Sequence, residues 1–382
     1  MAGKVVSPPA YAASKFVDRE SEVALVMDKA RAIAQGCPVE GRVIVFAGGR
    51  GLGKSWLLSY IRDQLASVKD LSVYALSLKG HTSTPVPALI VNDILAKFAR
   101  SIFPGKHWTS PADLSQELRG ELRALLQVKV LAVLVDEVHE ADPRLLEELE
   151  RYFLGPLALE PRVLIVMTGR GRLPLWRTPG LRLKALVREL QPFADVDCTR
   201  EQLTRQQPNA ASRALEIHSL SNGNPLANYL LAAHPDPIAA LDQVIEGMLE
   251  PLPAAERQQA REYLEALCVL RSFDEERIQA ALLAYDSKYR GWTFEQARQV
   301  REYLVRWAFA RWDGPRGGYI TDEPTRRLVE VYLMTAQRTK WLKLHESAIQ
   351  LYTDWASKYP GAAAHWQGEI DYHNKCLANA SQ

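Results

Sequence analysis

The chain has 382 residues, which is too long for one hydrophobic core of ordinary size, so we expect two or three domains. Hydrophobic residues make up 47% and charged residues 24%, as in globular proteins, and the longest apolar runs are only strand-sized, which excludes a membrane-spanning segment. The formal net charge of +2 gives no overall electrostatic reason to bind nucleic acid or anionic lipid, although a local basic face is still compatible with it.

The N-terminal half alternates between strand and helix patterns. Residues 1–15 are predicted to form a flexible arm, and Asp18 or Ser21 is expected to cap a helix that continues to about Ala34. After this helix, short apolar runs alternate with helical patterns, which predicts a parallel sheet with helices on both faces over residues 16–198. The predicted strands are residues 43–47, 71–78, 130–135, 163–168 and 185–190.

The C-terminal half is predicted to be helical in three successive parts. Residues 199–250 form a helical segment, and residues 251–340 combine helices with one hairpin, whose strands at 308–312 and 318–321 flank a tight Gly/Pro turn. A helix-rich module with one hairpin is the pattern of a winged helix. Residues 341–382 carry apolar and aromatic residues at helical spacing with one break, at Tyr359-Pro360-Gly361, which predicts a helical hairpin.

A glycine-rich loop lies between the first predicted strand and the helix that follows it. Residues 48–55 match the pattern G-x-x-x-x-G-K-S, in which backbone N–H groups surround a β-phosphate and the next helix points its positive end at the same anion. Lys54 would reach the β- and γ-phosphate oxygens, and the Ser55 hydroxyl would hold Mg²⁺. The residues predicted to bind nucleotide here are Gly48, Gly49, Gly51, Gly53, Lys54, Ser55 and Trp56.

Two carboxylates follow the apolar run 130–135, at the end of a strand where parallel α/β sheets place their ligands. Asp136 is predicted to complete the Mg²⁺ shell, and Glu137 to orient and deprotonate the water that attacks the γ-phosphate. This pair favours an ATPase over a GTPase, and a guanine-reading NKxD motif is also absent from the sequence. A solvated helix start is the alternative explanation for the two acidic residues.

The next predicted strand ends in Thr168-Gly169-Arg170, so a hydroxyl and a guanidinium emerge beside Asp136 at the same sheet edge. We favour Arg170 as the group that senses the γ-phosphate, because its planar fork matches phosphate oxygens. A structural salt bridge is the alternative role for Arg170.

Two features of the C-terminal half are open to two interpretations. Pro225, after Asn222-Gly223-Asn224, either packs on the adenine or simply starts a helix. Arginines around the predicted hairpin stand where a winged helix would meet DNA phosphates, but acidic residues are interleaved with them, which favours a solvated or internally paired face. These arginines are Arg298, Arg301, Arg306, Arg311 and Arg316, interleaved with Glu295, Glu302 and Asp313.

Taken together, these motifs resemble the STAND class of P-loop ATPases, which includes NB-ARC and NACHT proteins and bacterial transcription activators. Residues 16–20, Phe-Val-Asp-Arg-Glu, are similar to the family's entry motif beside adenine, which places Arg19 at the nucleotide, although Asp18 stands where a glycine is usual. The remaining motifs follow in family order. Ile320-Thr321-Asp322 stands where many relatives carry Met-His-Asp, so Thr321 replaces the histidine that contacts ADP.

The resemblance implies an α/β P-loop NTPase domain followed by an all-helical lid, a winged-helix domain and a short C-terminal helical hairpin. It also implies a switch in which ADP holds these parts closed, while ATP with Mg²⁺ opens them for self-assembly or for association with a partner protein. Such relatives usually carry an N-terminal effector and a long C-terminal repeat sensor. Neither is apparent here, so either the chain was truncated from a longer protein or a partner supplies both functions. Core and helix packing is the default role of the tryptophans in the C-terminal part, and any that are exposed in the C-terminal hairpin would suit that partner.

Two other functions compete with the switch. A DNA-engaging ATPase of the origin-recognition or transposition-loader type shares the glycine loop, the lid and often a winged helix. A module that holds ATP without turnover is the third hypothesis.

The compartment is predicted from what the sequence lacks. The N-terminus has no continuous apolar stretch of the signal-peptide kind, which indicates a cytoplasmic protein. The cysteines are scattered without a CxxC pair, which predicts reduced, buried thiols and no disulfide framework or zinc site. They are Cys37, Cys198, Cys268 and Cys376.

Overall fold

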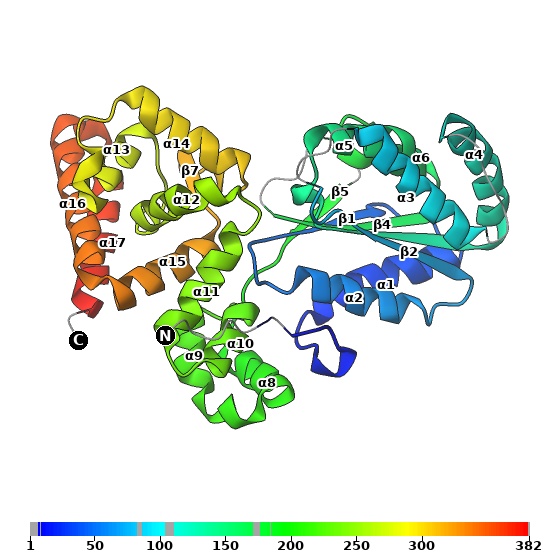
Figure 1. The fold of residues 1–382 in the computed structure, drawn as a ribbon, viewed down its shortest axis with the longest axis horizontal. Helices are drawn as coiled ribbons and strands as arrows, with labels where there is room; N and C mark the ends of the chain where they lie inside the picture. Colours follow the sequence, from blue (N-terminus) through cyan, green and yellow to red (C-terminus); the bar gives the residue numbers. More distant parts are fainter. Residues whose placement is uncertain are drawn as a thin grey trace. The chain divides into compact units, whose positions relative to one another are not determined.

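A computed structural model describes residues 7, 9–81, 86–103, 111–170, 176–183 and 185–380. Most of the predicted arm before residue 9 lies outside the described residues. The chain divides into two compact units, one formed by Pro9–Gly48 with Leu52–Gln191 and the other built around Pro192–Gln382. Each unit has its own architecture, α/β in the first and helical in the second (Figure 1).

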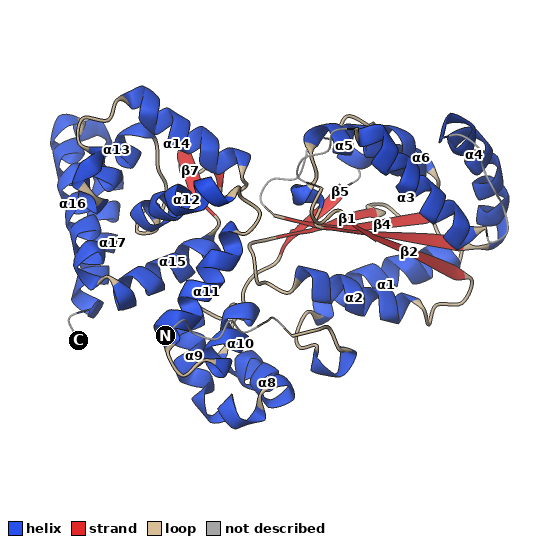
Figure 2. Cartoon of the chain, in the orientation of Figure 1, coloured by secondary structure: helices blue, strands red, loops and turns tan. Residues whose placement is uncertain are grey.

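The first unit contains one five-stranded parallel sheet, drawn in red in Figure 2. Its strand order is β2-β3-β4-β1-β5, so β4 lies between β1 and β3. All five predicted strands are confirmed. The central strands β1, β3 and β4 are buried apolar runs, the mark of strands covered on both faces, whereas the edge strands β2 and β5 are more exposed. The strands are β1 (Val43–Ala47), β2 (Leu71–Ser77), β3 (Val130–Asp136), β4 (Val163–Gly169) and β5 (Ala185–Glu189).

Helices cover both faces of this sheet (Figure 1). Successive residues of a strand point to opposite faces, so they belong to two separate hydrophobic cores. Ile44 and Phe46 of β1 pack with α1 and α2 on one face. Val43 and Val45 of the same strand face the other core, formed with α3, α5 and α6. The helices of this unit are α1 (Glu20–Ala34), α2 (Lys54–Leu65), α3 (Pro87–Ile102), α4 (Pro111–Val128), α5 (Pro143–Leu149), α6 (Gly155–Leu159) and α7 (Pro179–Arg182).

The start of α1 differs from the prediction that Asp18 or Ser21 caps it. Arg19 is the N-cap, and no side chain caps the helix by a hydrogen bond. Asp18 and Arg19 both have left-handed backbone conformations, with φ of 62° and 80°. A backbone of this shape explains why the resembled family prefers glycine at the position of Asp18, since glycine adopts positive φ at the least cost.

The described part of the predicted arm contacts α2. The ring of Tyr11 meets the ring of Trp56 edge to face at 5.6 Å between centroids, and its hydroxyl donates to Asp63 at 2.7 Å. Phe16 stacks on Tyr60 with 4.3 Å between centroids. Aromatic contacts therefore anchor the segment before α1 to the helix that follows the glycine loop.

The second unit is helical apart from one two-stranded hairpin. A continuous core runs from α8 to α16 and includes Leu203, Ile245, Leu267, Leu304 and Leu344. The predicted hairpin is confirmed as antiparallel strands β6 (Ala310–Asp313) and β7 (Gly318–Thr321), while the winged-helix assignment stays a prediction. The helices are α8 (Val196–Gln206), α9 (Ala214–Ser221), α10 (Pro225–Ala233), α11 (Pro237–Leu249), α12 (Ala254–Leu267), α13 (Glu275–Tyr285), α14 (Phe294–Arg306), α15 (Glu323–Ala336), α16 (Arg338–Lys358) and α17 (Ala363–Ala380).

The predicted C-terminal helical hairpin is confirmed as α16 and α17, with a short 3₁₀ turn at Pro360–Ala362 between them. Its tryptophans pack in the core, which confirms their default role, and they do not form the exposed patch that would suit a partner. Trp341 and Trp355 are buried, and Trp366 packs on the same core and stacks with Tyr352. Their spacing matches the inward face of each helix, so they stabilise the hairpin.

No helix among the described residues is both long and apolar enough to cross a membrane. All four cysteines are free thiols, but only Cys268 is buried, whereas Cys37 is exposed and Cys198 and Cys376 are partly exposed. The expectation that all four are buried is therefore wrong.

Candidate functional site

The glycine-rich loop connects β1 to α2 and has the backbone shape that its sequence predicts. Gly51 and Gly53 have φ of 83° and 81°, a region that side-chain-bearing residues rarely adopt. Gly53 is also the N-cap of α2, and the position of a Cβ on it has no heavy atom within 4 Å. The loop therefore leaves open space at the positive end of a helix of 12 residues, which suits an anion.

Lys54 and Ser55 begin α2 immediately after this loop. Lys54 is 8% exposed, and its Nζ donates to the carbonyl of Gly48 at 2.8 Å. The ammonium thus contacts the first residue of the glycine-rich loop. Ser55 is exposed, so its hydroxyl is accessible to an ion or a phosphate, and the partly buried Trp56 is held by Tyr11.

The ends of β1, β4 and β3 bring the loop and the carboxylates to one edge of the sheet. The N–H of Gly48 donates to the carbonyl of Gly169 at 3.2 Å, which joins the loop to the end of β4. Val135 of β3 pairs with Met167 of β4, so Asp136 and Thr168 are the next residues on the two neighbouring strands. Asp136 thus lies at the same edge of the sheet as the loop that follows β1, with only strand β4 between β3 and β1.

Thr168, Asp136 and Glu137 form a small polar network at this edge. The Thr168 hydroxyl donates to Asp136 Oδ1, and the backbone N–H of Glu137 contacts both Asp136 Oδ1 at 3.0 Å and Thr168 Oγ1 at 3.2 Å. Glu137 has a φ of 58°, which costs a non-glycine residue about 1 kcal/mol or more. The hydroxyl of Thr168 therefore holds an unfavourable backbone turn that sets the direction of the Glu137 side chain.

Thr168 is the residue whose role the sequence underestimated. The sequence places it beside Asp136 but favours Arg170 as the functional group, because the planar guanidinium matches phosphate oxygens. Arg170 directly follows β4 and is partly buried. Its predicted contact with a γ-phosphate stays a prediction.

The side chains at this edge fit a magnesium ion in their chemistry. A hydroxyl from Ser55 and a carboxylate from Asp136 are hard oxygen ligands, and Mg²⁺ is commonly bound by one or two such groups together with substrate phosphates. Asp136 is only partly buried, and Ser55 is exposed, so both oxygens are accessible. The predicted metal ligands are therefore compatible with the structure.

Arg19 is directed at backbone carbonyls around the loop. It is 7% exposed, and its Nη2 donates to Gln191 O at 2.6 Å and to Leu52 O at 3.4 Å. These contacts tie the segment before α1 to the glycine loop and to the residue pair that follows β5. Arg19 thus positions the loop, while its predicted contact with the nucleotide stays a prediction.

Pro225 lies in the helical unit, as the first residue of α10. The residue before it, Asn224, is 1% exposed and caps the helix by accepting from the N–H groups of Leu226 and Ala227, each at 3.1 Å. Gln202 of α8 donates to the Pro225 carbonyl at 2.8 Å. These contacts account for Pro225 as a helix start, and its predicted packing on adenine stays a prediction.

The arginines around the hairpin are engaged within the helical unit. Arg298 pairs with Glu302 at 2.9 Å and with Glu295 at 3.5 Å. Arg301 pairs with Glu275 and lies over the ring of Tyr319. Carboxylates therefore neutralise two of the three arginines of α14 that the sequence offered as DNA contacts. The third, Arg306, is exposed and lies over the ring of Trp307.

Arg316, in the hairpin turn, donates to the backbone carbonyl of Arg271 at 2.9 Å. Asp322, after β7, caps α15 by accepting from the Thr325 N–H at 3.1 Å and from its hydroxyl at 2.8 Å. Thr321, at the position where the resembled STAND proteins often carry histidine, is 6% exposed.

The fold and this site define a P-loop NTPase domain followed by a helical region. Residues 39–173 match the family model of the AAA domain, so this part of the chain is a P-loop ATPase domain of the AAA type. No curated protein sequence matches the chain significantly.

One of the solved structures that resemble the chain supports the same fold class. The Walker-type ATPase PABY2304 of Pyrococcus abyssi is 15% identical, covering 82% of this chain and 95% of that one, with a TM-score of 0.55. The ORC2 protein of Aeropyrum pernix is 13% identical over 85% of this chain and 94% of that one, with a TM-score of 0.42. A STAND protein with a tetratricopeptide repeat sensor from Pyrococcus horikoshii is 13% identical over 96% of this chain and 56% of that one, with a TM-score of 0.38.

Proposed function

We propose that the chain binds ATP, hydrolyses it slowly, and uses the bound nucleotide as a signal that controls its association with a partner protein. The glycine loop, the Asp136-Glu137 pair and the match to the AAA domain support nucleotide binding and hydrolysis. Lys54 binds the β- and γ-phosphates, and Ser55 and Asp136 hold Mg²⁺, which when bound neutralises charge on the phosphates. Glu137 orients and deprotonates the attacking water.

The charge arrangement of α14 is the observation that favours a protein partner over DNA. A DNA-binding face offers arginines to phosphates, and each such contact releases a counterion. Here Arg298 and Arg301 are already paired with Glu295, Glu302 and Glu275. DNA would have to displace these carboxylates or accept their charge, and both oppose binding.

A conformational signal needs the nucleotide to make different contacts in two states. The γ-phosphate is the only group that distinguishes ATP from ADP, and in this proposal Arg170 senses it at the end of β4. The partner supplies the sensor or effector function, and self-assembly in the ATP state is part of the same proposal. The protein acts in the cytoplasm.

The test compares one partner in defined nucleotide states. Tagged wild-type protein, Lys54→Ala and Glu137→Gln are used to capture proteins from extracts of the native organism in ATP and in ADP. A captured protein is then purified, and its affinity is measured by calorimetry. We expect at least a tenfold difference between Glu137→Gln with ATP and wild type with ADP, which corresponds to about 1.4 kcal/mol of coupling. Equal affinity in every nucleotide state would contradict the switch.

DNA binding is the outcome that would favour the origin-recognition or transposition-loader reading. Fluorescence anisotropy with a DNA duplex is measured over a range of salt concentrations for the wild type, for Arg298→Ala with Arg301→Ala, and for Arg213→Ala. Arg213, on the same unit and paired with Glu216 at 2.9 Å, is the matched control. If the binding constant falls with salt as steeply as several phosphate contacts require, and if only the double variant loses binding, the chain is a DNA-engaging ATPase. That result would contradict the partner-protein proposal.

A further inference from the structure

Three helices of the C-terminal region each direct one metal-ligating side chain toward a common point. Glu330 comes from α15, His345 from α16 and Cys376 from α17. One ligand atom from each residue lies within 4.8 Å of the ligand atoms of the other two. The three positions are far apart in the sequence, so no short motif announces the cluster. It belongs to neither the glycine loop nor the carboxylate pair, so it is independent of the proposed function.

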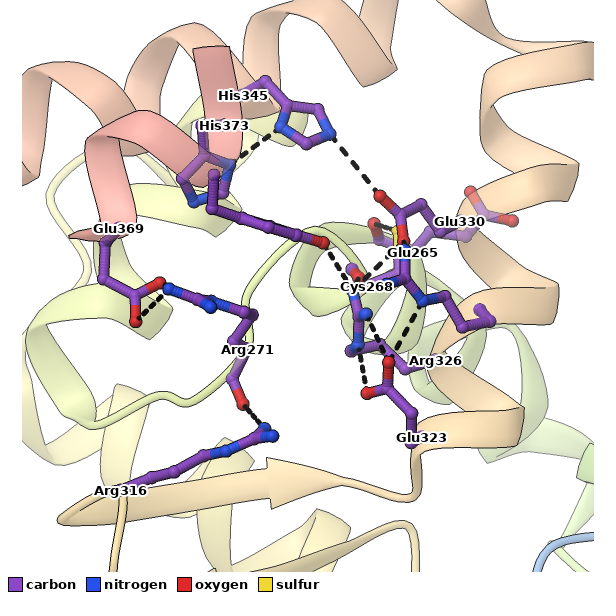
Figure 3. A network of polar contacts seen from close by, with 12 residues as sticks. Glu265, Cys268, Arg271, Arg316, Glu323, Arg326, Glu330, His345, Glu369 and His373 are labelled. Carbon is purple, nitrogen blue, oxygen red and sulfur yellow. Dashed lines mark hydrogen bonds and ion pairs between the residues drawn. The ribbon is translucent and has the colours of Figure 1, made fainter. Parts of the chain in front are cut away.

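The imidazole of His345 has one nitrogen engaged and one directed at this point. The side chain is fully buried, and its Nδ1 shares a hydrogen bond of 2.7 Å with Nδ1 of His373 (Figure 3). Its Nε2 has no hydrogen-bond partner and lies 3.6 Å from Glu330 Oε1, which is too long for a hydrogen bond. A buried polar atom without a partner is costly, and a ligand bound to Nε2 would remove that cost.

The carboxylate of Glu330 is held so that one oxygen is available. Oε2 accepts from Arg326 at 3.1 Å and from Arg327 at 3.2 Å, while Oε1 is turned toward His345 (Figure 3). Both arginines also pair with Glu323 of the same helix. Two guanidinium groups are therefore balanced by two carboxylates, which lowers the repulsion that a cation would meet at Oε1.

We propose that Glu330, His345 and Cys376 bind Zn²⁺ and that the ion ties α17 to α15 and α16. Thiolate, imidazole and carboxylate are all established zinc ligands, with bonds of about 2.0 to 2.3 Å. Tetrahedral coordination with such bonds separates neighbouring ligand atoms by roughly 3.3 to 3.8 Å. The Nε2–Oε1 distance of 3.6 Å already lies in this range. Because Cys376 Sγ is within 4.8 Å of the other two ligand atoms, it has to approach by about 1 Å at most, which a small side-chain rotation supplies.

The protons balance in a simple way. The Zn–S bond forms as the Cys376 thiol releases its proton to solvent, and this side chain is partly exposed, so both the ion and the proton have a route. His345 binds through the lone pair of Nε2 and carries its own proton on Nδ1, which donates to Nδ1 of His373. His373 thus acts as the outer partner that fixes the ring, as the hydrogen-bonded partners of zinc-bound histidines do. The protein supplies three ligands, and water takes the fourth position.

The first test uses cobalt as a spectroscopic substitute for zinc. Full-length protein is treated with a chelator, dialysed and titrated with Co²⁺, because a cysteine thiolate bound to Co²⁺ gives an intense near-ultraviolet charge-transfer band that oxygen ligands do not give. We expect the band to saturate at one Co²⁺ per chain and to disappear on adding Zn²⁺. Cys376→Ser should remove it, whereas Cys198→Ser, at another partly exposed cysteine, should leave it unchanged. No band, or an equal band in Cys376→Ser, would overturn the proposal.

The second test needs no variant and therefore does not depend on how a variant folds. Alkylation of each cysteine in the wild-type chain is followed by peptide mass spectrometry, with and without Zn²⁺. We expect Zn²⁺ to slow alkylation of Cys376 at least tenfold while the exposed Cys37 and the partly exposed Cys198 react at unchanged rates. Unchanged alkylation of Cys376, or equal slowing at all three thiols, would show that this cluster holds no zinc.

Discussion

The hydroxyl of Thr168, the last side chain of β4, donates a hydrogen bond to the carboxylate of Asp136 at the end of β3. The same hydroxyl oxygen lies 3.2 Å from the backbone nitrogen of Glu137, whose φ is 58°. One uncharged side chain therefore orients both the predicted magnesium ligand and the predicted general base. Thr168 itself is fully buried, so substrate is not expected to contact it.

Replacing Thr168 by Val should lower the ATPase rate while leaving nucleotide affinity nearly intact. The methyl group keeps the packing, but Asp136 and the N–H of Glu137 lose the partner that positions them. Loss of such an outer contact typically costs 10- to 100-fold in activity. Thr168→Ser keeps the hydroxyl and is the control, expected to retain most of the rate. Steady-state phosphate release and ADP calorimetry make the measurement, and equal rates for Val and Ser would mean that the hydroxyl has no role.

The strands of the sheet were predictable because each is marked by an apolar run within its own segment of the sequence. Runs such as residues 130–135 are apolar on both sides, which is the mark of a strand covered by two helical layers. The glycine loop was equally readable, since Gly51 and Gly53 occupy conformations that few other residues adopt.

What the sequence could not reveal depends on contacts between distant residues. Nothing local indicates that Asp18 and Arg19 both adopt positive φ, so the start of α1 was assigned to the wrong cap. The burial of Trp341 and Trp355 depends on which face of α16 the rest of the core covers. Apolar spacing indicates which face of α16 is buried, but it does not indicate which distant residues cover that face.

Glu137→Gln should abolish hydrolysis and preserve ATP binding. The amide keeps the shape of the side chain but cannot accept a proton from water, and loss of a general base usually costs 10²- to 10⁴-fold in rate. Glu40→Gln, at an exposed residue before β1, is the matched control. Single-turnover hydrolysis and ATP calorimetry separate the two steps. An unchanged rate would remove Glu137 as the base, and an undetectable wild-type rate would favour a module that only holds ATP.

Lys54→Ala should weaken ATP and ADP binding by about 100-fold or more. Hydrogen bonds to charged groups contribute about 1.5 to 3 kcal/mol each, and this ammonium is expected to make more than one to the phosphates. The matched control is Lys97→Ala, which removes an exposed lysine paired with Asp93 at 2.6 Å on α3. Calorimetry on both variants makes the comparison, and full retention of affinity in Lys54→Ala would contradict the assignment of the loop.

Arg326→Met should destabilise the helical unit by about 3 to 5 kcal/mol. The guanidinium is fully buried and donates to Glu323, Glu330 and the carbonyl of Cys268. Without this guanidinium the buried carboxylate of Glu330 has fewer partners. The cost of leaving that charge uncompensated exceeds the net stabilisation that the Arg326–Glu330 pair contributes. Adding Glu330→Gln should recover part of the loss, because it removes the uncompensated charge.

The control for Arg326 is its neighbour on the exposed side of α15. Arg327→Met removes a partly exposed arginine that contacts the same two carboxylates, and we expect less than about 1 kcal/mol. Urea denaturation at pH 7 measures all three variants. If Arg326→Met and Arg327→Met lose similar free energies of unfolding, burial of the Arg326–Glu330 pair contributes little to the cost of removing Arg326.

Glu323 should make the stability of the helical unit depend on acid pH. Burial raises the pKa of this carboxyl, but the hydrogen bonds and charges of Arg326 and Arg327 outweigh burial and lower the pKa to about 2, from 4.5. Between these two pKa values the folded state therefore binds fewer protons than the unfolded state. The stabilisation that ionised Glu323 gives the folded state is complete above pH 4.5 and is lost as the pH falls toward 2. The side chain is about half exposed, so solvent screening limits the effect to roughly 1 kcal/mol.

Urea denaturation midpoints at pH 6 and pH 3.5 test this prediction for wild type, Glu323→Gln and the exposed control Glu276→Gln. The difference in midpoint between wild type and Glu323→Gln should be smaller at pH 3.5 than at pH 6. A difference that stays constant or grows would mean that Glu323 is not held ionised by its arginines.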